Sequence, residues 1–178
     1  MTITFEVLGH CQTAGSKRGF AIARKGQPMT LNGKFNGRVL ITDMNPKGRE
    51  WKNRIADIAS QAMAKLDLPF QEPLLTGPVE VWFEFRMPRP QSHYRTGQFC
   101  GHLKDSAPTW HIGRPDALKL ARCAEDALTG VVWRDDSQIV KEHLEKVYGD
   151  VPGMNVTICT LAVAVERVME KQAGLALA

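Results

Sequence analysis

Alternating hydrophobic and polar residues along the chain predict a set of β-strands. The segment 79–87 (VEVWFEFRM) alternates most clearly, because every second residue from Val79 to Met87 is apolar and most residues between them are charged. Less regular patterns predict further strands at 2–9, 20–23, 37–44, 137–149 and 154–166. The last two of these strands are expected to be joined by a turn at 149–153.

A first helix is predicted over residues 45–66. Trp51, Ile55 and Ile58 recur there at close to helical spacing. Asn45 and Pro46 are typical of the residues that begin a helix, since asparagine caps the free amides and proline tolerates the first helical position. We therefore expect the chain to enter this helix at Asn45.

A second helix is predicted over residues 116–129. At about 100° per residue, one face of this helix collects Ala117, Leu120, Ala121, Ala124, Ala127 and Leu128. Gly130 follows the last periodic residue and is expected to cap the C-terminus. Leu118 is the exception, because it falls on the polar face of this helix. An exposed leucine is common, and this one is also placed to pack against a loop or a partner subunit.

Strands interleaved with two helices, without regular βαβ alternation, predict an α+β fold: a mixed or antiparallel sheet with two main helices packed on it. We expect one domain over residues 1–166 and a C-terminal tail over 167–178 that forms a short helix or is disordered. Residues 88–115 have little periodicity, and a connection of this length in a compact domain is usually functional or disordered.

Composition is that of a globular protein, with 43% hydrophobic and 24% charged residues among 178. No apolar run is long enough to cross a membrane, and the start MTITFEVLGH lacks the layout of a signal peptide. The four cysteines are widely spaced and form no CxxC motif, so we expect them to be reduced. These features predict a cytoplasmic protein.

Positive charge is concentrated in the first third of the chain. Residues 1–54 carry ten Lys or Arg and three acids, whereas the remaining residues carry thirteen and sixteen. Such a basic segment suits a polyanion such as nucleic acid, and it is equally compatible with a solvated basic loop.

Acidic residues flank the second predicted helix. Asp116 precedes it, and local sequence favours an N-cap over a metal ligand at that position. Asp135 and Asp136 likewise fit a turn between helix and strand. Taken as a set beside a basic segment, however, these acids resemble a Mg²⁺ site that acts on a phosphodiester, because Mg²⁺ prefers carboxylate oxygens and lets phosphate complete its coordination.

The stretch RPDALKLARCAEDALTGVVWRDDSQIV (114–140) resembles the signature of RusA-type Holliday-junction resolvases, a family common in phages and prophages. The matching positions include Arg114-Pro115-Asp116, Lys119-Leu120, Arg122, Asp126-Ala127-Leu128, Gly130 and Asp135 through Ile139. Similar features, including the basic GSKR (15–18), extend the resemblance over roughly residues 3–165. One position departs from it: the family pattern has D-x-D, and the second acid is Leu118 here.

The resemblance implies site residues and their roles. Asp116 and Asp136 would hold Mg²⁺, for which Mn²⁺ can substitute, and Asp135 is the other candidate of its pair. Arg122 would contact the phosphate or stabilise charge in the transition state. Asp126 fits a structural role, and Glu125, which lies on the same side of the helix as Leu118, is a candidate replacement for the missing acid.

The resemblance also implies the substrate and the assembly. We expect a homodimer that cuts four-way DNA junctions symmetrically in recombination and repair. The expected DNA-binding residues are Lys17, Arg18, Arg114 and Lys119. The alternative function is a junction-binding protein with weak or no catalysis, since Leu118 removes one family acid. A nuclease of other branched or flap DNA is a third possibility.

Overall fold

The computed structural model describes residues 1–15, 17–23, 25, 29–43, 45–66 and 74–162. Its centre is a four-stranded sheet in the order β1-β8-β6-β7. The strands are β1 (Thr2–Leu8), β6 (Val79–Pro88), β7 (Ile139–Gly149) and β8 (Gly153–Thr160). β8 is antiparallel to both β1 and β6, whereas β6 and β7 are parallel, so the sheet is mixed, as predicted.

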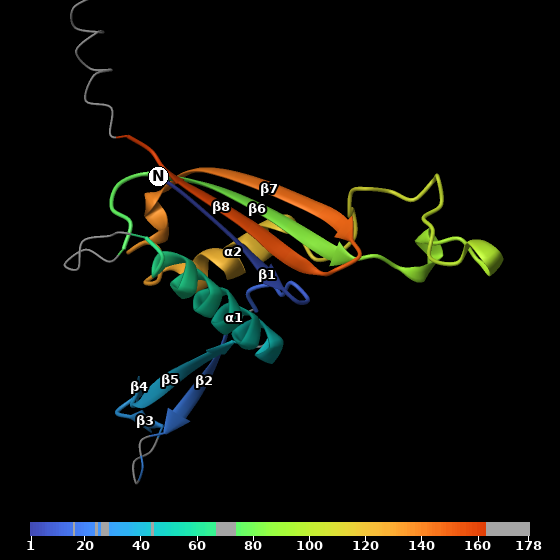
Figure 1. The fold of residues 1–178 in the computed structure, drawn as a ribbon. Helices are drawn as coiled ribbons and strands as arrows, with labels where there is room; N and C mark the ends of the chain where they lie inside the picture. Colours follow the sequence, from blue (N-terminus) through green and yellow to red (C-terminus); the bar gives the residue numbers. More distant parts are fainter. Residues whose placement is uncertain (16, 24, 26–28, 44, 67–73, 163–178) are drawn as a thin grey trace, which may run out of the picture.

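Two helices, α1 (Pro46–Met63) and α2 (Ala117–Leu128), pack against one face of this sheet (Figure 1). The predicted α+β fold is thereby confirmed. Alternate residues of β6, from Val79 to Met87, point to the helices and are buried, because the strand pleat sends successive side chains to opposite faces. No helix in the described part of the chain is both long and apolar enough to cross a membrane.

The helix boundaries agree closely with the sequence patterns. Asn45 precedes α1 and Pro46 is its first residue, as expected, but the Asn45 side chain makes no capping hydrogen bond and its Nδ2 donates to Thr13 O. The apolar stripe of α1, including Trp51 and Ile55, is buried against the sheet. α2 ends at Leu128, and Gly130 follows with a φ of 79°, a conformation that glycine adopts without strain.

A separate two-stranded ribbon precedes α1. It pairs β2 (Lys17–Ala23) with β5 (Gly37–Asp43), and it projects beyond α1, away from the main sheet (Figure 1). A small hairpin at its end joins β3 (Thr30–Leu31) to β4 (Lys34–Phe35). This hairpin was not among the predicted elements, although its turn residues Asn32 and Gly33, both with positive φ, are a typical two-residue hairpin signal.

β7 and β8 are joined by a short turn, as expected, but they are not paired with each other. β6 lies between them, with Phe83 opposite Leu144 of β7 on one side and Val156 of β8 on the other. The short turn therefore connects two strands that both pair with β6 and not with each other. The predicted tail at 167–178 lies outside the described residues.

The connection between β6 and α2 extends far from the sheet (Figure 1). It contains two short 3₁₀ helices, Gln91–His93 and Gly97–Phe99, and an isolated bridge pairs Tyr94 with Leu103. None of the buried hydrophobic residues comes from 89–114, so this segment has no apolar core of its own. We call residues 89–114 the arm.

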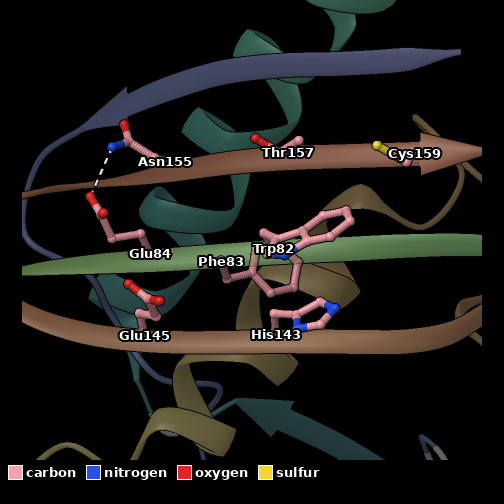
Figure 2. Close-up of a pocket in the computed structure, with 8 residues that line it drawn as sticks. All are labelled: Trp82, Phe83, Glu84, His143, Glu145, Asn155, Thr157 and Cys159. Carbon is pink, nitrogen blue, oxygen red and sulfur yellow. Dashed lines mark hydrogen bonds between the residues drawn. The ribbon is translucent and has the colours of Figure 1, made fainter.

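The face of the sheet opposite the helices is open and polar (Figure 2). A shallow hollow of about 400 Å³ lies there. The Trp82 and His143 rings stack with centroids 4.7 Å apart, and Asn155 Nδ2 donates to Glu84 Oε1 over 2.9 Å. These side chains partner one another, and the predicted site acids do not line the hollow.

Candidate active site

α2 runs along the edge strand β7, in the opposite direction. At one end, Lys146 Nζ donates to the carbonyl oxygens of Gly113 and Pro115, just before α2 begins. At the other end, Glu125 hydrogen-bonds with Glu142 of β7. Lys146 and Glu142 face α2 because their partners on β6, Phe85 and Val81, belong to the buried face. Asp116 lies at the first of these ends, directly after Pro115, and Asp136 lies at the second, in the groove with Glu125 and Glu142.

Asp116 occupies the N-cap position of α2, but its carboxylate makes no capping hydrogen bond. Only its main-chain oxygen is used in the first turn, where it accepts from the N–H groups of Lys119 and Leu120. The carboxylate is instead 3.3 Å from Lys119 Nζ and is 64% exposed. The capping interpretation of this side chain is therefore wrong, and its oxygens are accessible to a ligand.

Asp136 lies at the other end of the site, close to Glu125 and Glu142. The three acids line a groove of about 330 Å³ together with Lys141. Burial, the hydrogen bond with Glu142 and the negative charges of Glu142 and Asp136 raise the pKa of Glu125 to about 7. Crowded carboxyl groups of this kind favour a bound proton or a bound cation, since either relieves their repulsion.

Leu118 and Arg122 lie between these two ends. Leu118, Arg122 and Glu125 share one face of α2, because residues four and seven positions apart in a helix align. At 1.5 Å per residue, about 13 Å of helix axis separates Asp116 from Glu125. Leu118 is 71% exposed on this face, where the family pattern has an acid. The missing carboxylate is therefore the one that would lie between Asp116 and the acids around Glu125.

No group of three His, Cys, Asp or Glu side chains in the described ranges is close enough together to hold a metal ion. The available donors nevertheless suit a hard divalent cation, because they are carboxylate oxygens on an accessible surface. Mg²⁺ is commonly held by one or two protein carboxylates, with water and substrate phosphate completing its shell.

Asp135 and Gln138 fix the turn that presents Asp136. Asp135 accepts from the Ser137 N–H over 2.9 Å, and Gln138 Oε1 accepts from the N–H groups of Arg134 and Asp135. Gln138 Nε2 also donates to the carbonyl oxygens of Leu75 and Gly77. The hydrogen bonds from Ser137 hold the pKa of Asp135 below its ordinary value. Asp135 is thus engaged by its own turn, whereas Asp136 faces the groove.

The remaining predicted residues are dispersed. Arg122 and Arg114 are exposed, and neither forms an ion pair with an acid of the described segments. Arg18 lies over the Phe20 ring of the ribbon, 5.2 Å from its centroid, and Lys17 begins the same strand. Asp126 pairs with Lys52 over 2.6 Å and so links α2 to α1, in line with a structural role.

Two residues of the site were missed by sequence reasoning. Glu142 and Lys146 lie on β7, outside the family motif, in a stretch whose charged residues show no clear alternation. The available signal was their spacing of four residues, which places both on the same face of the strand as Leu144.

Comparison with known proteins gives the site its context. A family model described as endodeoxyribonuclease RusA matches residues 25–159, which include both helices, the arm and all the acids described above. This chain belongs to the RusA family. It is also 29% identical over 126 residues to the uncharacterized protein YqaN of Bacillus subtilis (strain 168), an alignment that covers 69% of this chain and 80% of YqaN. RusA-family membership makes an endodeoxyribonuclease acting on branched DNA the function class of this chain.

Proposed function

We propose that this RusA-family chain is a divalent-metal-dependent endonuclease that cuts four-way DNA junctions as a homodimer. The observation that carries the proposal is the exposed edge between α2 and β7, where Asp136, Glu125 and Glu142 line one groove. Family membership supports the nuclease class and dependence on a divalent cation. The substrate, the symmetric cleavage and the dimer are inferences from the family.

Asp116 and Asp136 are the proposed metal ligands. The exposed carboxylate of Asp116 supports this role, since helix capping does not use it. Glu125 is the proposed replacement for the acid missing at Leu118, because it shares the face of Leu118 and lies near Asp136. When bound, Mg²⁺ or Mn²⁺ supplies Lewis-acid chemistry that polarises a phosphoryl oxygen and stabilises developing negative charge.

Basic residues complete the proposed site. Arg122 lies on the exposed face of α2 between the acids, where its guanidinium can offset charge on the phosphate. Without DNA, the Lys119 ammonium group pairs with the Asp116 carboxylate. When a divalent cation binds Asp116 instead, Lys119 is released from this pair and can contact a DNA phosphate. Lys17, Arg18 and Arg114 are proposed to hold the DNA backbone, which fixes position without reading sequence.

A homodimer fits the geometry of junction resolution. Two cuts in opposed strands require two sites related by a two-fold axis, and a C2 dimer supplies them. Each protomer would then contribute one α2–β7 edge to one strand of the junction.

A second function is favoured by one observation, the leucine at position 118. Leu118 occupies the exposed face between Asp116 and the acids near Glu125, so no carboxylate connects the two ends of the site. No cluster of three metal-ligating side chains forms among the described residues. The chain would then bind junctions through its basic surface with little or no cleavage.

A paired assay separates the two functions. The full chain is mixed with a synthetic four-way junction in Mg²⁺ or Mn²⁺ and the products are examined for symmetric nicks, while binding is measured in EDTA. Cleavage of the junction, but not of a duplex of the same sequence, supports the nuclease. Binding in EDTA without nicks in either metal supports the second function, and an absence of both contradicts each of them.

A further inference from the structure

The arm carries exposed apolar side chains that its own packing does not use. Phe99, Leu103, Trp110 and Ile112 are 50%, 42%, 58% and 96% exposed. The arm is held together by polar contacts instead, such as the hydrogen bonds from Arg95 N to His102 O and from Lys104 N to His93 O. Apolar side chains displayed on an ordered segment without a core are typical of a binding surface.

The base of the arm is fixed to the end of β7. The Tyr148 ring meets the rings of His93 and His111 edge-on, each with centroids 4.8 Å apart, and Arg89 lies over its face. The Tyr94 hydroxyl donates to Asp150 over 2.6 Å. These contacts come from both legs of the arm, so the arm leaves the sheet in a defined direction.

The charge of the arm favours a polyanion. Residues 89–114 contain four Lys or Arg and one acid, Asp105, which pairs with Arg95 over 2.7 Å. Arg89 and Lys104 donate to backbone carbonyl oxygens and leave their charge uncompensated. Cationic residues interleaved with exposed aromatic rings are the usual makeup of surfaces on which nucleic-acid bases stack.

The return leg of the arm leads directly into the candidate active site. Trp110 is bridged to Val147 of β7, and His111 N donates to Lys146 O over 3.0 Å. Lys146 in turn holds Gly113 and Pro115, the residues before Asp116. Trp110 and Ile112 are thus displayed from a segment anchored to β7, immediately before the N-terminal end of α2.

We infer that the arm contacts the branch point of the DNA and that Trp110 stacks on a base exposed there, with Ile112 packed beside it. This inference rests on the proposed function, because it assumes that branched DNA occupies the α2–β7 edge. Base faces are covered by neighbours within a duplex, and inserting a ring there requires unstacking. A branch point leaves base faces open, so the arm selects branched DNA over duplex.

The test compares Trp110→Ala, Trp110→Phe and the control Leu8→Ala in the full chain. Leu8 is 51% exposed at the end of β1, outside the arm. Binding to a four-way junction and to a duplex is measured by fluorescence anisotropy in EDTA. We expect Trp110→Ala to weaken junction binding about 5-fold to 100-fold and duplex binding much less. Trp110→Phe should retain most of the affinity, and Leu8→Ala should resemble the unsubstituted chain.

A second readout uses 2-aminopurine placed at the branch, whose fluorescence changes when a ring stacks on it. The unsubstituted chain should change this signal, and Trp110→Ala should not. Junction binding that is unaffected by Trp110→Ala would overturn the role of the arm and leave the nuclease proposal standing. An unsubstituted chain that does not prefer the junction overturns the proposed function first. Altered sedimentation of Trp110→Ala without DNA would assign the arm to contact with a second copy and overturn the DNA assignment.

Discussion

Glu125 of α2 and Glu142 of β7 bring their carboxyl groups within reach of each other at the edge of the sheet. Two such groups form a hydrogen bond only when one of them carries a proton. Burial and the charge of the neighbouring acids accordingly raise the pKa of Glu125 from 4.5 to about 7. The contact joins the helix of the family motif to an edge strand outside it, and it makes the site sensitive to pH and to cations.

Stability without metal should therefore fall as the pH rises through neutrality. The pKa of Glu125 is higher in the folded chain than in the unfolded chain, so its stabilising effect is complete below about pH 4.5 and is lost above about pH 7. Glu125→Gln keeps this position neutral and should raise the free energy of unfolding at pH 8 by on the order of 1 kcal/mol, allowing for solvent screening, with little change at pH 5.

Urea unfolding in EDTA at both pH values measures this difference. Glu145→Gln, on the open face of the same strand, is the matched control and should show no such pH-dependent gain. An equal effect of Glu125→Gln at pH 5 and pH 8 would contradict the assignment.

Asp135 and Asp136 should respond differently to substitution, although they are adjacent. Asp135→Ala removes the cap from the Ser137 N–H and should lower the free energy of unfolding. Asp136→Ala should leave stability nearly unchanged and reduce cleavage on the order of 100-fold, while binding in EDTA persists. Thermal unfolding and junction cleavage, measured on both variants, separate these roles. If Asp135→Ala abolished cleavage and Asp136→Ala did not, the roles assigned to the two aspartates would be contradicted.

Restoring the family acid should raise activity. Leu118→Asp places a carboxylate on the exposed face of α2 between Asp116 and Arg122, and we expect junction cleavage in Mg²⁺ to rise by about tenfold or more. The substitution lies in the first turn of α2, where the helix dipole favours negative charge, so the fold should tolerate it. Leu118→Asn has a similar shape without the charge and should not raise the rate. A gain in both variants would point to the removal of leucine rather than to metal binding.

The affinity for DNA should fall steeply as the salt concentration rises. The slope of this dependence should decrease when a residue that contacts a phosphate is replaced. Arg114→Gln should lower the slope of log affinity against log salt by about 0.9, the value for one phosphate contact on duplex arms. Lys65→Gln removes the same charge from the groove between β1 and the end of α1, outside the candidate site, and should leave the slope unchanged. Equal slopes for the two variants would mean that Arg114 makes no phosphate contact.

The fold was largely predictable because its elements have strong local signals. β6 alternates over its whole length, and α2 combines an apolar stripe with Gly130 at its end. The separation of β7 from β8 was not predictable from their short turn, since the position of β6 between them depends on packing of residues far apart in the sequence.

The candidate site was predictable where it coincides with the family motif. The family motif identified Asp116, Arg122 and Asp136. The roles given to these residues are predictions. The absence of capping by the Asp116 carboxylate could be seen only in the structure, because the local sequence favours a cap that this side chain does not make. Glu142 was missed for a different reason: it lies on an edge strand in a charged stretch, and only the packing of α2 brings it to Glu125.

The central claim is that the carboxylates of Asp116 and Asp136 bind divalent cations against the DNA backbone. Crystals of the full chain with junction DNA, soaked in Mn²⁺, test it most directly through the anomalous signal of the ion. We expect Mn²⁺ beside α2, with a carboxylate oxygen of Asp116 or of Asp136 and a phosphate oxygen among its ligands. Mn²⁺ held by Glu125 and Glu142 without either aspartate, or DNA bound at this face with no ion, would contradict the claim.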